Sequence, residues 1–143
     1  MAFIEFEWCT PLYQQSLELR HRALRDPLGL KFTAEELDAE FKDRHFGWTT
    51  DDGDLIAAVL AHRMDATTAR LRQMVVSPAH QRQGIGRQLL AGTETALRDE
   101  GVAEFQLHAR ETAIPFYESS GYVAVGDPFQ HVGLAHQTMS KSF

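Results

Sequence analysis

Two glycines, Gly84 and Gly86, open a stretch with helical periodicity and lie between two arginines, Arg82 and Arg87. The first turn of a helix has backbone N–H groups without intrahelical partners, and the helix dipole adds partial positive charge there. Glycine lets a ligand approach the backbone closely, and the arginines add formal charge. The segment therefore predicts a phosphate or pyrophosphate site, although a tight strand-to-helix turn without a ligand could have the same glycines.

Two better-known phosphate loops differ from this segment. The P-loop has Lys and then Ser or Thr after its glycine, whereas Gly86 is followed by Arg87 and Gln88. The dinucleotide fingerprint has a third glycine, and Leu89 stands at that place here. The segment is therefore neither of these loops.

The elements that position this turn follow from apolar periodicity and turn residues. Apolar residues at helical spacing predict a helix over 84–99, and Gly101 ends this helix. The strand before the turn is predicted over 70–76, and Pro78 ends it. Two more helices begin at Thr10-Pro11 and at Thr33, where Glu36 completes the spacing of a capping box. The first of these extends to about residue 25, and a last short helix covers 112–120.

The remaining segments are predicted as strands, with a hairpin turn at residues 51–54. These strands are expected at 3–8, 45–50, 55–63, 104–109, 122–125 and 134–140. The order β-α-α-β-β-β-α-β-α-β-β predicts a mixed α/β fold, in which helices flank a mixed sheet within a single domain over residues 1–143. Cys9, the one cysteine, is expected as a small core residue at the end of the first strand.

Two motifs resemble those of the GNAT superfamily of N-acetyltransferases. The spacing Val76-x-Pro78-x-x-Gln81-x-x-Gly84-x-Gly86 resembles its coenzyme A motif, and the segment 113–122, with the sequence AIPFYESSGY, resembles its second signature. Both motifs have the expected order and separation, with a strand between them. The resemblance covers residues 70–140 by motif and the N-terminal third only by the order of elements.

The resemblance implies a mostly antiparallel sheet that is splayed between its fourth and fifth strands, with the pantetheine arm of acetyl-CoA in the gap. It implies that the backbone of Met74, Val75 and Val76 binds this arm, and that the N–H near Met74 polarises the thioester carbonyl. Arg110 departs from many relatives, which have Asn there. The full set of expected cofactor contacts is Met74, Val75, Val76, Gln81, Arg82, Gln83, Gly84, Ile85, Gly86, Arg87, His108, Arg110, Phe116 and Tyr117.

The implied reaction is direct attack of a neutral primary amine on the thioester, which requires a proton acceptor and a proton donor. Tyr117 matches the tyrosine that commonly serves as the acid in this family; a buried structural aromatic is the alternative. Some relatives carry a glutamate base at the position of Arg70, and arginine cannot accept a proton. The base is therefore left open among His108, His136, His45 and a chain of ordered water.

The acceptor site is expected from residues 20–50 and the last hairpin. Its polar candidates are Arg22, Arg25, His45, Arg72, Gln73 and His136. Arginines there suit an acceptor with a carboxylate or phosphate, whereas surface ion pairs are an equal alternative for Arg22 and Arg25.

Composition narrows the choice of partners. The net charge of −6 argues against nucleic acid or an anionic membrane as the main partner, and no run of residues has the length and apolar character of a membrane span. A single cysteine and no Cys/His ligand spacing predict a cytoplasmic protein without a metal. The expected partners are a small-molecule or peptide amine and a second copy of the chain in a homodimer. A non-catalytic acyl-CoA-binding sensor on the same fold is the alternative function.

Overall fold

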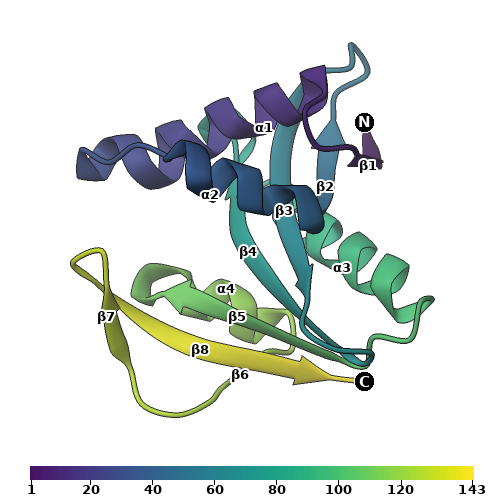
Figure 1. Cartoon of the computed structure of the whole chain (residues 1–143). Coiled ribbons are helices and arrows are strands. Elements are labelled where there is room, and N and C mark those ends of the chain that lie inside the picture. Colours follow the sequence, from purple (N-terminus) through teal and green to yellow (C-terminus); the bar gives the residue numbers. More distant parts are fainter.

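Eight strands form one sheet in the computed structural model, which describes residues 1–143 (Figure 1). The strand order is β1-β2-β3-β4-β5-β8-β6, and β7 also pairs with β8. All neighbours are antiparallel except β4 and β5, which run parallel. The strands are β1 (Ala2–Phe6), β2 (Arg44–Thr49), β3 (Leu55–Arg63), β4 (Thr68–Val76), β5 (Glu104–Arg110), β6 (Val123–Ala124), β7 (Phe129–His131) and β8 (Leu134–Ser142).

Helices cover both faces of this sheet (Figure 1). One face packs against α3 (Ile85–Arg98), whose buried side chains Ile85, Leu89 and Leu97 join the larger apolar core. The other face is covered by α1 (Pro11–Arg20) and α2 (Ala34–Ala39), and a smaller apolar cluster lies under α1. The short α4 (Ile114–Ser119) follows β5. No helix combines the length and apolar character that crossing a membrane requires.

The sheet opens between β4 and β5. The two strands pair only from Thr68 to Leu71 and from Glu104 to Leu107, and beyond these residues they diverge (Figure 1). The remainder of β4 still pairs with β3, and the remainder of β5 with β8. Each diverging strand therefore has one free edge of backbone N–H and C=O groups that faces the gap.

The expected mixed α/β fold, with a sheet that splits between its fourth and fifth strands, is confirmed. The capping box of Thr33 and Glu36 is confirmed as well. Three details differ from expectation. The first strand ends at Phe6, and Cys9 is exposed in the following turn with a φ of 65°, so its assignment to the core is wrong. The first helix changes at residue 21 into a π-helical turn (His21–Arg25). The short strand β7 was not predicted, because three residues between turns carry no readable alternation.

Candidate functional site

A cavity of about 880 Å³ lies where β4 and β5 diverge. Met74, Val75 and Val76 line it from β4, and Tyr117 lines it from α4. The π-helical turn contributes Arg25, and the side chain of Arg110 at the end of β5 donates to the carbonyl oxygen of Leu24 in that turn at 3.0 Å. The cavity therefore joins both sides of the split to the segment that follows α1.

A β-bulge shapes the wall that β4 presents to the cavity. The register between β3 and β4 shifts by one residue between Ala58 and Leu60, so β4 has an extra residue between Arg72 and Val75. Gln73 lies in this bulge with a φ of 53°, a left-handed conformation that non-glycine residues rarely adopt. The bulge breaks the regular alternation of β4 next to Met74, whose backbone the resemblance assigns to the thioester carbonyl.

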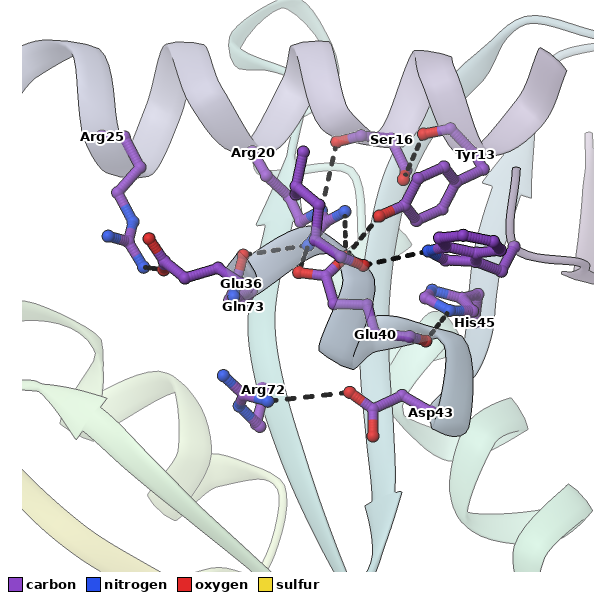
Figure 2. Close-up of polar contacts among 12 residues, drawn as sticks. Tyr13, Ser16, Arg20, Arg25, Glu36, Glu40, Asp43, His45, Arg72 and Gln73 are labelled. Carbon is purple, nitrogen blue, oxygen red and sulfur yellow. Dashed lines mark hydrogen bonds and ion pairs between the residues drawn. The ribbon is translucent and has the colours of Figure 1, made fainter. Parts of the chain in front are cut away.

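A buried ion pair holds the bulge in place (Figure 2). Arg20 at the end of α1 is fully buried and donates to both carboxylate oxygens of Glu40, at 2.8 and 2.9 Å. The same guanidinium donates to Oε1 of Gln73 at 3.0 Å. Tyr13 donates its hydroxyl to Glu40 at 2.8 Å, and burial is the main reason that the pKa of Tyr13 is raised to about 12. Through Arg20 the bulge is thus tied to the end of α1 and to Glu40, the residue that follows α2.

The turn between β4 and α3 has the geometry expected of an anion site. Gly84 is the N-cap of α3 with a φ of 81°, and no side chain caps the helix. Because Gly84 supplies no capping oxygen, the first N–H groups of α3 have no side-chain partner. Gln81 donates from Nε2 to the carbonyl oxygen of Val76 at 3.1 Å, which fixes the start of the turn.

The two neighbouring aromatic residues of α4 have different surroundings: Tyr117 faces the cavity, and Phe116 faces the start of α3. Phe116 is the nearest side chain to the position where a Cβ on Gly86 would lie, at 3.3 Å, whereas Tyr117 lines the cavity. The Tyr117 hydroxyl is 3.7 Å from the sulfur of Met74. Burial raises the pKa of Tyr117 to about 12, so the phenol stays protonated at neutral pH and can donate.

His108 and His136, which both line the cavity, differ in the hydrogen-bond partners of their ring nitrogens. Arg70 Nη2 lies 2.7 Å from Nδ1 and 3.0 Å from Nε2 of His108, and burial followed by the charge of Arg70 lowers the pKa of this imidazole. The single acceptor nitrogen of neutral His108 is thus engaged by a guanidinium. In His136, Nδ1 lies 2.9 Å from the carbonyl oxygen of Leu134 and must donate to it, so Nε2 is the acceptor nitrogen in the neutral form of this ring.

His45 and Arg22 lie outside the cavity. His45 is buried between Phe6 and Tyr13, its Nε2 donates to the carbonyl oxygen of Glu40 at 3.0 Å, and burial lowers its pKa. Arg22 is exposed and does not line the cavity. Neither residue therefore lies at the cavity where the acceptor and its base are expected.

The other acceptor candidates, Arg25, Arg72, Gln73 and His136, all line the cavity. Two of them have acidic neighbours (Figure 2): Arg25 pairs with Glu36 at 3.1 Å, and Arg72 lies 3.6 Å from Asp43. Of the expected cofactor contacts, one group lies outside the cavity, in the turn, the start of α3 and α4. This group comprises Arg82, Gln83, Gly84, Ile85, Gly86, Arg87 and Phe116.

Sequence reasoning missed Arg20, Glu40 and His62. The first two look like surface positions of amphipathic helices, and no local spacing links residues that are 20 apart in sequence. His62 lines the cavity from β3, and its Nδ1 is 2.7 Å from Asp43. The only local signal for His62 is its place directly after the continuous apolar run of β3, which gives no hint of a cavity.

Comparison with known proteins agrees with this geometry. The chain is 30% identical over 91 residues to the uncharacterized N-acetyltransferase YjcF of Bacillus subtilis, a match that covers 63% of this chain and 65% of that protein. The first curated relatives are matched over only about half of their length, 53% and 54%.

Two solved structures have the same fold over nearly the whole chain. One is an aminoglycoside 6'-N-acetyltransferase complexed with coenzyme A, with a TM-score of 0.82, 18% identity, and coverage of 99% of this chain and 97% of that one. The other is a GNAT family acetyltransferase from Elizabethkingia anophelis with acetyl-CoA bound, with a TM-score of 0.76, 15% identity, and coverage of 99% and 97%. The family model described as an acetyltransferase (GNAT) domain matches residues 25–143. This chain therefore belongs to the GNAT family of acetyltransferases.

Proposed function

We propose that the chain is a single-domain N-acetyltransferase that transfers the acetyl group of acetyl-CoA to a primary amine by direct attack on the thioester. The observation that carries the proposal is the split between β4 and β5, where free backbone edges, an open cavity and the side chain of Tyr117 meet. A linear amide chain such as pantetheine can satisfy such free edges in the way an added strand would. Two proteins with this fold bind coenzyme A and acetyl-CoA.

The residues present fit this donor, which supplies an activated acetyl group. The uncapped N-terminus of α3, flanked by Arg82 and Arg87, suits the pyrophosphate. The backbone N–H groups near Met74 are proposed to polarise the acetyl carbonyl. The amine nitrogen forms the new bond to the carbonyl carbon as the carbon–sulfur bond breaks, and Tyr117 donates its proton to the departing sulfur.

His136 is our proposed acceptor of the amine proton. Its Nε2 is the acceptor nitrogen in the neutral form of the ring, it lies in the cavity wall, and it is paired in register with Arg110 at the end of β5. We predict that His136→Gln lowers kcat by about 10²-fold, because glutamine keeps a polar group there but cannot take a proton. Steady-state kinetics with any accepted amine measure this, with His108→Gln as the comparison. A larger loss of kcat in His108→Gln than in His136→Gln would reverse the assignment.

The donor site has its own test, which needs no acceptor. Gly84→Val should weaken acetyl-CoA binding by at least 10-fold, because valine disfavours a φ of 81° and its side chain would lie beside the proposed pyrophosphate. Gly29→Val is the matched control, since Gly29 has a φ of 71° with open space around it and lies outside the turn. Isothermal titration with acetyl-CoA measures both variants. Equal affinity in Gly84→Val and wild type would contradict the proposed pyrophosphate site.

The alternative is a non-catalytic acyl-CoA sensor with the same donor site. Release of free thiol from acetyl-CoA in the presence of a panel of amines separates the two functions. A sensor would bind acetyl-CoA without amine-dependent thiol release.

A further inference from the structure

The face of the sheet opposite α3 is lined by basic side chains where it borders the cavity. On β4, Leu71 and Ala69 point into the core under α3, so Arg70 and Arg72 alternate to the other face. On β5, Leu107 and Ala109 also lie in that core, which places His108 and Arg110 on the same face as the two arginines. We call these four residues, together with His62 and His136, the basic face.

The lining of the cavity has no acidic side chain, and only Asp43, behind His62 and Arg72, pairs with this face. None of the residues that line the cavity is Asp or Glu, although the chain has 20 acidic residues and a net charge of −6. Arg72 has Asp43 nearby at 3.6 Å, whereas Arg70 contacts only His108 and Arg110 only a backbone carbonyl. Burial and the neighbouring charge of Arg72 lower the pKa of Arg70. Arg70 is therefore a partly desolvated cation without a carboxylate partner.

The phosphates of the donor do not account for this charge. The proposed pyrophosphate site follows the end of β4 at Val76, with Arg82 and Arg87 beside it. Arg70 precedes Val76 by six residues on β4, which corresponds to about 20 Å at about 3.3 Å per residue. The charge at Arg70 thus lies at the closed end of the split, beyond the proposed position of the thioester at Met74.

We infer that the acceptor is a small amine that carries a carboxylate or phosphate group, and that Arg70, with Arg72 next to it, binds this anionic group. The inference rests on the proposed function, since it places the acceptor amine at the thioester. An anion there would replace the missing acidic partner of Arg70 with charge-assisted hydrogen bonds. The acceptor amine would then point along β4 toward Met74, Tyr117 and His136.

The test uses pairs of amines that differ only in the anionic group. One arm compares each proteinogenic amino acid with its amide, and the other compares O-phosphoethanolamine with ethanolamine, so that carboxylate and phosphate are distinguished. Binding is measured by isothermal titration to the enzyme saturated with coenzyme A, which permits no turnover. We expect at least one anionic amine to bind about 10- to 100-fold more tightly than its neutral counterpart.

Substitution then connects this preference to Arg70. Arg70→Gln should remove the 10- to 100-fold preference, so that the anionic and the neutral amine of each pair bind with similar affinity. Arg98→Gln is the matched control, because this exposed arginine on α3 changes the same charge on the opposite face. A preference of the same size in Arg70→Gln, or neutral amines that bind as tightly as anionic ones to wild type, overturns the inference.

Thiol release measured with the same amines keeps the two proposals apart. Turnover of neutral amines without an anionic preference would leave the N-acetyltransferase proposal intact and overturn the anionic acceptor. An anionic preference in binding without any thiol release would contradict the transferase proposal and retain the anion site. Absence of both would overturn both.

Discussion

Replacing Tyr117 with phenylalanine is expected to lower kcat by about 10²- to 10⁴-fold, the usual contribution of a general acid. The change removes one oxygen and keeps the ring that packs against Phe116 and Tyr122. The hydroxyl's one contact within the chain is a weak one to the sulfur of Met74 at 3.7 Å. Because the hydroxyl is not part of a buried hydrogen-bond network, its removal should cost little stability, and acetyl-CoA affinity should change little.

The matched control is Tyr122→Phe. The Tyr122 hydroxyl donates to Glu94 at 2.7 Å in the core, away from the cavity. Its removal should lower the melting temperature, because Glu94 loses a buried partner, while kcat stays near the wild-type value. Kinetics and thermal unfolding of both variants test the pair. A Tyr117→Phe enzyme with nearly normal kcat would make Tyr117 a structural aromatic and remove it from the mechanism.

Local signals in the sequence predicted the framework well. The hairpin turn at residues 51–54, the caps at Thr10 and Thr33, and the glycines at 101 and 121 each set a boundary through a requirement of the backbone itself. The strand from Leu55 to Arg63 has the predicted ends for this reason. Such signals depend on residues only a few positions apart, so one sequence is enough to interpret them.

Cys9 and the π-helical turn show where local signals fail. A small apolar residue next to an alternating segment is typical of a strand, yet the chain turns after Phe6, and Cys9 adopts a φ of 65° outside the core. The π-helical turn replaces the expected last turn of the first helix, and its Leu24 carbonyl accepts from Arg110. That contact joins residues 86 apart in sequence, so no helical periodicity could predict it.

The candidate site divides in the same way. Residues that the resemblance assigned to the donor site could be named in advance, and three of them, Met74, Tyr117 and Arg110, line the cavity. His45 was expected beside them because it lies in a segment assigned to the acceptor, but its strand places it under α1 between two aromatic rings. Alternation along β4 did contain the information that Arg70 and Arg72 share a face. What the alternation could not give is that Arg72 has Asp43 nearby whereas Arg70 has no carboxylate partner, because both facts depend on the whole fold.

The second large effect concerns Glu40, whose carboxylate neutralises Arg20 inside the protein. Glu40→Gln keeps the size of the side chain but leaves a guanidinium buried without a counter-charge. Loss of one partner of a buried pair typically costs about 3–5 kcal/mol. We therefore expect the free energy of unfolding of Glu40→Gln to fall by about that amount, measured by urea denaturation. Glu36→Gln is the matched control, since Glu36 pairs with Arg25 in a partly exposed position and glutamine preserves the capping box. It should cost about 1 kcal/mol or less.

A double variant separates the effect of the buried charge on stability from the effect of packing. If the uncompensated cation causes the loss, Arg20→Met combined with Glu40→Gln should be more stable than Glu40→Gln alone, because no charge is then left in the core. We expect kcat to fall in the double variant, because methionine cannot donate to Gln73 and the bulge at a φ of 53° loses its anchor. A double variant with restored stability but low kcat would therefore identify Arg20 as a positioning residue for β4. A double variant with restored stability and a wild-type kcat would instead show that the bulge holds its conformation without Arg20.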